Sequence, residues 1–196
     1  MVLILVGFAL ITGSLLAWVN HITAGPIAQQ DQITLANGIK EVMGTNDLKV
    51  KSDKDIKQTI DGKEAQFTVH EVTDAAGKAL GAAIESTTLG FGGDLKVLVG
   101  FDATGKVLGY TILSTSETPG LGVKADKWFQ KDGKGNIIGR QMDTTKPLVV
   151  RKDGGDVDAI TASTITSRAF LKAVNQAYAV YKNQSVGAAV VASNTK

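Results

Sequence analysis

Residues 95–114 read LKVLVGFDATGKVLGYTILS, and this stretch decides the fold. It contains two β-rich runs, Leu95–Phe101 and Val107–Ser114, on either side of the turn Asp102-Ala103-Thr104-Gly105. Short apolar and β-branched runs that are separated by Gly and Asp are typical of antiparallel hairpins. The stretch therefore predicts a hairpin within an antiparallel sheet.

Two upstream runs extend the hairpin into a meander. Ala65–Val72 and Ala79–Ser86 are also strand-like, and the turn Asp74-Ala75-Ala76-Gly77 separates them. Runs at this spacing with turn residues between them are expected to pair with their neighbours in the chain. The core of the protein is thus predicted to be a meander sheet.

A helix that covers this sheet is predicted from Ser167 to about Lys182. Its apolar residues recur at helical spacing and share one face. These residues are Phe170, Ala173, Val174, Ala177, Val180 and Tyr181. The expected fold class is α+β, an antiparallel sheet meander covered by helices.

The N-terminal segment predicts a single membrane-spanning helix. Met1–Val19 carries no charged side chain, and the first ionised one is Asp31. Roughly 18 to 20 apolar residues cover about 27–30 Å, which is enough for the hydrocarbon core of a bilayer. Trp18 suits the head-group boundary, and Gly25-Pro26 is expected to end the helix.

A cleaved signal peptide is the alternative for this segment. It would need a basic start, a shorter apolar stretch and a small-x-small cleavage site. No Lys or Arg precedes the apolar run, and Pro26 interrupts the candidate cleavage region at Ala24 to Ala28. We therefore expect an uncleaved anchor, whose orientation the flanking charges do not fix.

These elements predict four parts of the chain. Residues 1–22 form the transmembrane anchor, 23–60 a juxtamembrane helix and linker, 61–183 the folded domain, and 184–196 a flexible tail. The juxtamembrane helix is predicted from near-helical spacing of apolar residues between Gln29 and Met43. Lys49–Lys57 is rich in charge and predicts no particular structure, and the tail is small and polar.

Composition excludes several classes of function. The 21 basic and 19 acidic side chains form no long runs, so nucleic acid is not an expected partner. The chain has no Cys and only His21 and His70, which excludes iron–sulfur clusters, thiolate zinc sites and most haem ligation. No metal site is expected, His70 is interpreted as structural or exposed, and any redox chemistry must use an organic cofactor.

Other common sites are also missing from the sequence. Nothing matches a P-loop or a GxGxxG fingerprint, so a Rossmann cofactor fold is disfavoured. No Ser-His-Asp arrangement or carboxylate pair suggests hydrolysis, and we expect no catalytic residues.

The most informative stretch is Asp158-Ala159-Ile160-Thr161-Ala162-Ser163-Thr164-Ile165-Thr166-Ser167, which leads directly into the last helix. Small hydroxyl residues at a helix start supply caps, and the unpaired backbone N–H groups there favour a phosphate. Capping alone is the alternative explanation for this cluster of hydroxyl groups.

This stretch resembles the flavinylation motif of the FMN-binding domains in the Rnf and Na⁺-translocating NADH:quinone reductase complexes, whose pattern is Asp-x-x-Ser/Thr-Gly-Ala-Thr-x-Thr-Ser. The resemblance implies FMN held covalently by a phosphoester on Thr164, with Ser163 and Thr161 as lesser candidates. Two positions depart from the pattern. Ala162 stands in place of Gly and would hinder a positive φ, and Ser163 stands in place of Ala and adds a competing hydroxyl.

Two more motifs resemble the same domains. Glu117-Thr118-Pro119-Gly120-Leu121-Gly122 makes a rigid turn that lets backbone approach a flat ligand, and Glu117 can accept hydrogen bonds. Gly90-Phe91-Gly92-Gly93 resembles the element that opens the central hairpin of those domains, although a bulge or turn explains it equally well. The cofactor site is accordingly expected to comprise Glu117, Thr118, Gly120, Leu121, Gly122, Thr161, Ala162, Ser163, Thr164, Thr166 and Ser167.

Two neighbouring segments leave their roles open. Trp128 and Phe129 could shield the flavin ring or pack in the core. The segment Lys146–Lys152, which reads KPLVVRK, predicts a short strand with solvated ends whose basic residues could approach the flavin phosphate.

The resemblance implies the G subunit of an Rnf-type complex, an ion-translocating ferredoxin:NAD oxidoreductase. Such a protein relays electrons between membrane partner subunits, some of them ferredoxin-like, and has no catalytic turnover of its own. The chain shows no base that would activate a Thr hydroxyl, so a separate flavin transferase is expected. The implied location is the bacterial cytoplasmic membrane, with the folded domain on the extracytoplasmic, periplasmic side.

Three alternatives remain open at the level of sequence. The C subunit of the Na⁺-translocating NADH:quinone reductase shares the motifs but is usually longer. A free-standing anchored extracytoplasmic flavoprotein would carry the same cofactor. A scaffold or adhesion module would be colourless.

Overall fold

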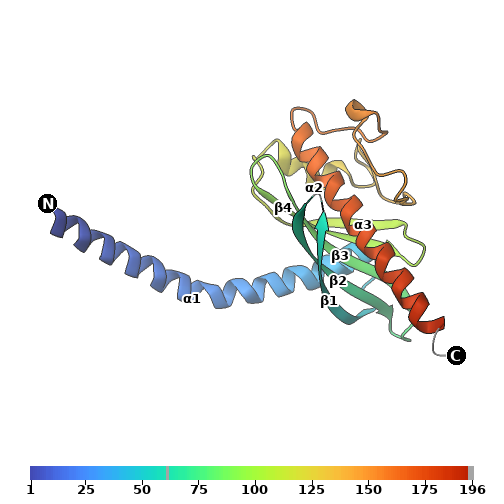
Figure 1. Ribbon diagram of the computed structural model, residues 1–196, viewed down its shortest axis with the longest axis horizontal. Helices are drawn as coiled ribbons and strands as arrows, with labels where there is room; N and C mark the ends of the chain where they lie inside the picture. The colour runs from blue at the N-terminus through green and yellow to red at the C-terminus, as the bar shows by residue number, and fades with distance from the viewer. Residues whose placement is uncertain (61, 194–196) are drawn as a thin grey trace. The chain divides into compact units, whose positions relative to one another are not determined.

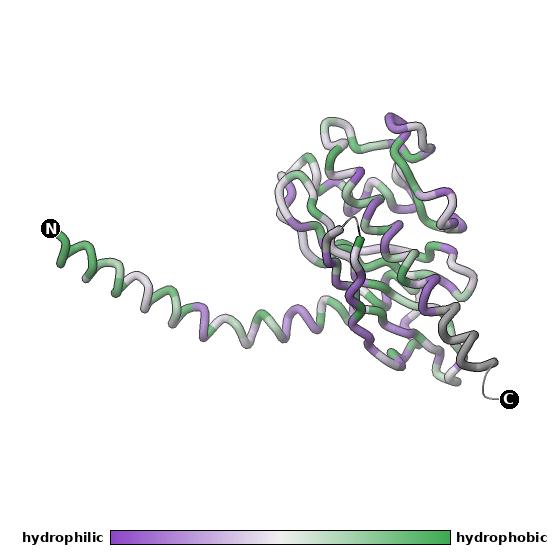
Figure 2. The backbone as a smooth tube through the Cα atoms, in the orientation of Figure 1, coloured by the Kyte–Doolittle hydropathy of each residue, from purple (hydrophilic) through white to green (hydrophobic). Residues whose placement is uncertain are grey.

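The computed structural model describes residues 1–60 and 62–193, which fall into two compact units, Met1–Asn37 and Gly38–Lys196. Helix α1 (Val2–Met43) forms the first unit and ends in the second. Figure 2 shows that the N-terminal part of α1 is predominantly hydrophobic. By length and composition α1 could cross a membrane, and no other helix of the described residues could.

Helix α1 corrects one prediction. Gly25-Pro26 does not end the helix, and no separate helix begins at Gln29, because α1 continues through Pro26 to Met43. An interior proline costs about 3 kcal/mol of helix stability. The residues after it include good helix formers, and the last turn is held by the burial of Ile39, Val42 and Met43. A local breaker is thus overridden by tertiary packing.

In the described part of the chain, five strands form one antiparallel sheet in the order β1-β2-β3-β4-β5, with helices around it (Figure 1). The strands are β1 (Leu48–Ile60), β2 (Lys63–Asp74), β3 (Ala79–Leu89), β4 (Asp94–Asp102) and β5 (Val107–Thr115). Each strand pairs with the next in sequence, which confirms the α+β meander and the four predicted strands.

Strand β1 was not predicted. It occupies Leu48–Ile60, where the sequence suggested a linker, and it pairs with β2 along its length. Its burial pattern leaves most side chains exposed, as suits the edge of a sheet, where charged residues discourage pairing with other chains. The charged residues that kept the sequence from predicting this strand are therefore the kind of residues that edge strands commonly carry.

A polar ladder around His70 crosses four strands. His70 on β2 is buried, with Nδ1 2.7 Å from Asp53 on β1 and Nε2 2.9 Å from Glu85 on β3. Glu85 forms a further ion pair with Lys96 on β4. Burial alone would lower the pKa of His70, but the two carboxylates outweigh this effect and raise that pKa above its ordinary value. His70 is thus a structural residue that ties the edge strand to the sheet.

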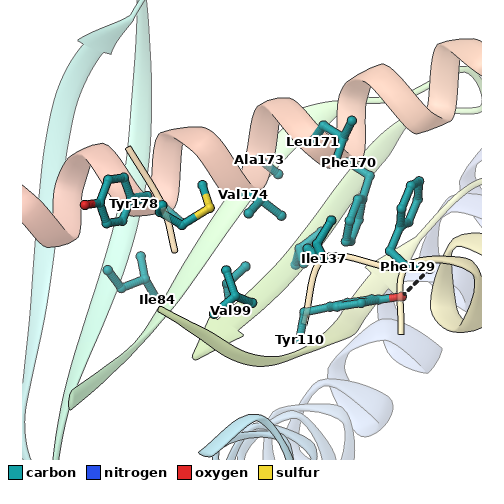
Figure 3. Close-up of a cluster of buried hydrophobic side chains, with 14 of the residues drawn as sticks. Ile84, Val99, Tyr110, Phe129, Ile137, Phe170, Leu171, Ala173, Val174 and Tyr178 are labelled. Carbon is teal, nitrogen blue, oxygen red and sulfur yellow. Dashed lines mark hydrogen bonds between the residues drawn. The ribbon is translucent and has the colours of Figure 1, made fainter. Parts of the chain in front are cut away.

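Helix α3 (Thr164–Ser193) covers one face of the sheet, mainly over β3 and β4. Phe170, Ala173, Val174 and Ala177 are fully buried, which confirms the predicted face of the helix. In Figure 3 the ring of Phe170 lies beside those of Phe129 and Tyr110. The ring centroids of Phe129 and Phe170 lie 4.3 Å apart and the two rings are stacked. The ring of Tyr110 meets that of Phe170 edge-on, with 4.7 Å between the centroids.

Helix α3 is longer than predicted at both ends. It begins at Thr164, within the hydroxyl-rich motif, and runs to Ser193 through most of the segment that the sequence assigned to a flexible tail. Residues 194–196 of that tail lie outside the described residues.

The opposite face of the sheet receives the last turn of α1. Gly100 on β4 and Gly109 on β5 face each other, and a Cβ atom added to either would lie 2.6 or 2.8 Å from the carbonyl oxygen of Val42. Gly100 alternates with core residues Val99 and Phe101, so its own face is the one opposite α3. These two glycines let the helix backbone contact the strands directly.

A long connection between β5 and α3 carries three short helices, η1 (Gly122–Lys124), α2 (Ala125–Trp128) and η2 (Arg151–Asp153). The strand predicted at Lys146–Lys152 does not form. Val150 makes one isolated bridge with Val157, and η2 follows at once. The chain turns back at Gly154, whose φ is 88°, so no extended partner remains for a longer strand.

The His70 ladder predicts a pH-dependent stability. A raised folded-state pKa means that the ladder stabilises the protein fully below the unfolded value of about 6.5 and loses this contribution as the pH rises through the folded-state pKa. The free energy of unfolding, measured by urea titration of the full chain in detergent, should therefore fall over this window. His70→Gln should flatten that slope, and a variant that keeps the whole slope would show that another group causes it.

Candidate functional site

The three sequence motifs meet at one pocket of about 380 Å³. The turn at 90–93, the loop at 117–122 and the start of α3 contribute its walls, although they are far apart in the chain. A volume of this size lies within the range of about 300–1,000 Å³ that small-molecule sites occupy. The lining residues are Phe91, Glu117, Thr118, Leu121, Gly122, Ala162, Ser163, Thr164, Ile165 and Thr166.

The start of α3 offers the pocket a site for an anion. Thr164 is the first residue of the helix. The first backbone N–H of the helix that donates a hydrogen bond is that of Ser167, to the carbonyl oxygen of Ser163 at 3.0 Å. Among the described residues, the N–H groups of Thr164, Ile165 and Thr166 have no hydrogen-bond acceptor. Free N–H groups and the positive end of the helix dipole together favour a phosphate.

Two hydroxyl groups of the motif are used to build the helix start. The Ser167 hydroxyl accepts a hydrogen bond from the N–H of Ile160 and donates one to the carbonyl of Ser163, each 2.9 Å long. The Thr166 hydroxyl donates to Oε2 of Glu117, also at 2.9 Å. Both residues are buried, so capping and packing account for these two hydroxyl groups.

Thr164 is different from the other candidates for attachment. It lines the pocket, it is half-buried, and its hydroxyl has no hydrogen-bond partner in the described part of the chain. Thr161 is exposed and does not line the pocket. Ser163 lines the pocket but is only 8% exposed. The Ser163 hydroxyl also has no hydrogen-bond partner in the described part of the chain, but of the two residues that line the pocket Thr164 is the more exposed.

Ala162 adopts the conformation that its side chain disfavours. Its φ is 61°, and it is the one non-glycine residue with a positive φ among those described. The left-handed region costs an L-residue about 1–2 kcal/mol. The flavinylation motif has Gly at this position, and the backbone here does adopt a left-handed conformation. In this chain an alanine adopts that conformation, at a cost in strain.

Glu117 connects the three walls of the pocket. It is 6% exposed, its Oε1 accepts a hydrogen bond from the N–H of Phe91 at 2.7 Å, and its Oε2 accepts the one from Thr166. A Cβ atom at Gly90 or Gly122 would lie 2.1 or 2.4 Å from these carboxylate oxygens. The glycines of two motifs thus make room for one buried carboxylate.

Three residues of the predicted site do not line the pocket. Gly120, with a φ of 77°, makes the turn of the 117–122 loop, Ser167 is buried beneath the helix start, and Thr161 is exposed to solvent. Gly120 and Ser167 thus shape the backbone next to the pocket, whereas the Thr161 side chain makes no hydrogen bond to it among the described residues.

The two aromatic residues make their contacts outside the pocket lining. Phe129 is fully buried in the core. Trp128 is half-buried, lines a neighbouring groove, and donates its indole N–H to the carbonyl of Asp158 at 2.8 Å. Neither residue lines the pocket, and Arg151 of the predicted basic strand pairs with Asp158 at 2.8 Å instead.

Sequence reasoning missed two residues of the site. Phe91 is 69% exposed and Ile165 is 52% exposed, and both line the pocket. Phe91 was quoted as part of a turn, and Ile165 falls at a variable position of the motif. The sequence did contain one signal for these two residues. Each is a large apolar side chain at a position that is expected to face solvent, in a turn or at the start of a helix, where core packing does not account for it.

Two family models match the chain. The model described as FMN-binding domain matches residues 90–179, which contain the whole pocket. The model described as RnfG N-terminal region matches residues 2–42, which correspond to almost all of α1.

Relatives of known assignment cover most of the chain. The G subunit of the ion-translocating oxidoreductase complex of Shewanella baltica strain OS223 is 35% identical over 185 residues, 90% of this chain and 85% of that protein. The G subunit of the Na⁺-translocating ferredoxin:NAD⁺ oxidoreductase complex of Acetobacterium woodii is 31% identical over 189 residues, 93% of this chain and 91% of that one.

A solved structure shares the fold. The crystal structure of Shewanella oneidensis NqrC matches with a TM-score of 0.51 at 20% sequence identity, and the match covers 70% of each chain. At this identity the likeness supports the architecture of the domain and nothing about its partners.

The strained alanine yields a prediction about stability. Ala162→Gly should raise the free energy of unfolding by a few tenths to about 1 kcal/mol, because relief of the left-handed strain exceeds the entropic cost of glycine. Urea unfolding of the full chain in detergent measures this. Ala103→Gly, in the exposed turn after β4, is the control and should lower stability by about 0.4–1 kcal/mol. Equal losses from both changes would contradict the strain.

Proposed function

Because the chain belongs to the family of G subunits of ion-translocating oxidoreductase complexes, we propose that it is an electron-transfer subunit of such a complex and that it carries FMN covalently on Thr164. The observation that carries the proposal is the half-buried Thr164 hydroxyl, which lies at the start of α3 and lines a pocket large enough for a small-molecule cofactor. The FMN-binding domain match covers the same residues.

The residues of the pocket fit a flavin phosphate attached at this point. The N–H groups of Thr164, Ile165 and Thr166 are available to its oxygens, and the dipole of α3 favours its charge. Phe91, Leu121 and Ile165 supply apolar contacts for a flat ring. FMN supplies the redox centre when it is bound, and the task of the chain is to fix its position and exposure.

Attachment requires help from another protein. A Thr hydroxyl is a weak nucleophile until a base takes its proton, and no His, Lys or Asp lines the pocket among the described residues. Glu117 does line it, but both of its oxygens already accept hydrogen bonds. We therefore infer a separate flavin transferase that supplies both the base and the FMN donor.

Helix α1 is proposed to anchor the domain in the cytoplasmic membrane by a single pass, with the domain on the periplasmic side. Its apolar residues up to Val19 are largely exposed, as expected of a helix that meets lipid. A cofactor bound through a covalent bond stays at a high effective concentration even outside the cytoplasm, where a free flavin would be diluted. The lipid bilayer and the membrane subunits of the complex are the implied partners.

The relatives point to the kind of complex. One of them is named as part of a Na⁺-translocating ferredoxin:NAD⁺ oxidoreductase, which supports electron exchange with membrane and ferredoxin-like subunits. A role as the C subunit of a Na⁺-translocating NADH:quinone reductase has less support, because the NqrC likeness concerns the fold alone. A free-standing anchored flavoprotein would leave the match of residues 2–42 without a role.

Removal of the proposed attachment point should abolish covalent flavin. Full-length chain made together with the transferase should show a flavin-fluorescent band on a denaturing gel and a mass increased by one FMN phosphoester. Thr164→Ala should lose both signals and remain folded, because the Thr164 hydroxyl has no structural hydrogen bond among the described residues.

Matched controls locate the bond within the motif. Thr161→Ala and Ser163→Ala remove the neighbouring hydroxyl groups and should leave the fluorescent band and the mass increase intact. A band that persists in Thr164→Ala but disappears in Ser163→Ala would move the attachment by one residue.

The orientation can be tested because the chain has no native Cys. Ala103→Cys places a thiol in the exposed turn between β4 and β5, and Val2→Cys places one at the start of α1. A membrane-impermeant maleimide should label Ala103→Cys in intact spheroplasts and label Val2→Cys only after permeabilisation. The reverse pattern would put the domain in the cytoplasm.

A further inference from the structure

We propose that Glu117 is the positioning residue of the flavin pocket, and that its negative charge lowers the reduction potential of the flavin. Its carboxylate holds the start of α3, the 117–122 loop and the turn at 90–93 in one arrangement. This inference rests on the proposed function, but its positioning part concerns the polypeptide alone.

The hydrogen bonds of Glu117 add a direct connection between the turn at 90–93, which the pairing of β4 with β5 brings near the 117–122 loop, and the start of α3. Oε1 accepts from the backbone of Phe91 at 2.7 Å, and Oε2 accepts from the hydroxyl of Thr166 at 2.9 Å. Thr166 lies two residues after Thr164, on the first turn of α3. The carboxylate thereby fixes the helix end that presents the attachment residue.

The surroundings of Glu117 are adapted to it. Gly90 and Gly122 come from two different motifs, and a Cβ atom at either position would overlap a carboxylate oxygen. The side chain is 6% exposed, and Thr166 is 1% exposed. A carboxylate is costly to bury unless it is well hydrogen-bonded, so its two hydrogen bonds are needed to keep it there.

Glu117 is the one acidic residue that lines the pocket among the described residues. Both oxygens accept hydrogen bonds, as an ionised carboxylate does, and Glu117 takes part in none of the ion pairs of the described residues. Interactions between charges are strong where water is excluded. A negative charge on the wall disfavours the addition of electrons to a flavin beside it, which lowers the reduction potential.

Two substitutions separate position from charge. Glu117→Gln keeps the shape and an acceptor for the N–H of Phe91, and the Thr166 hydroxyl can rotate to accept from the amide. Glu117→Ala removes the charge and both hydrogen bonds. Asp132→Asn, on an exposed carboxylate of the neighbouring groove, is the control for loss of one negative charge outside the pocket.

The experiment uses the full-length chain made with the flavin transferase. Three quantities are measured for each variant: the midpoint potential by redox titration of the flavin absorbance, the fraction of chain that carries flavin, and the unfolding temperature. Glu117→Gln should keep the unfolding temperature and flavin content close to those of the unchanged chain and shift the potential to a more positive value. Glu117→Ala should lower both the unfolding temperature and the flavin content, and Asp132→Asn should change none of the three.

A second pair of variants tests the contact with α3 while the charge is kept. Thr166→Val removes the hydroxyl that donates to Glu117 and should reduce the flavin content. Thr166→Ser keeps the hydroxyl, so its flavin content should stay close to that of the unchanged chain. These variants decide the positioning role even if a change at Glu117 prevents folding.

Each part of the proposal can be overturned separately. An unchanged potential in Glu117→Gln refutes the effect of charge, and unchanged stability and flavin content in Glu117→Ala and Thr166→Val refute the positioning role. If the unchanged chain itself carries no flavin, the proposed function fails and the charge effect fails with it. The unfolding temperatures of Glu117→Ala and Glu117→Gln would still decide the positioning role.

Discussion

The packing of helix α3 on β3 and β4 is the constraint on which the rest of the structure depends. The buried face that includes Phe170, Val174 and Ala177 fixes the helix axis over the sheet, and Phe129 and Tyr110 close the core around Phe170. A helix that is held along its length also has a fixed end. The end at Thr164 therefore presents free backbone N–H groups and the Thr164 hydroxyl at a defined place among the described residues.

The two faces of the sheet have different neighbours. Helix α3 contributes large side chains on one face, whereas the last turn of α1 contacts the other through the glycines at 100 and 109. This close backbone contact leaves no room for a side chain at either glycine. The burial of the last turn of α1 also offsets the cost of Pro26, which would otherwise favour an earlier end of the helix. Large buried side chains therefore hold α3 on one face of the sheet, whereas the absence of side chains at two glycines admits the end of α1 on the other.

The sequence predicted those features that depend on local pattern. Strands β2 to β5 are short β-rich runs separated by Gly and Asp, and α3 has a clear apolar face, so both were predicted correctly. Strand β1, the helix beyond Pro26 and the absence of a strand at 146–152 depend on pairing and burial by distant segments, which local pattern does not contain. The site divides in the same way: the motifs located the pocket, but only the fold showed that Glu117 joins them and that Phe91 and Ile165 complete the wall.

The pocket has walls from Phe91, from the 117–122 loop and from residues 162–166, and the last of these are held by the start of α3. A polypeptide still emerging from the ribosome cannot form this cavity until α3 has been synthesised and packed on the sheet. A shorter polypeptide that contains β1 to β5 but not α3 has the sheet without one wall of the cavity. The cavity is therefore a property of the fully packed domain and not of the sheet alone.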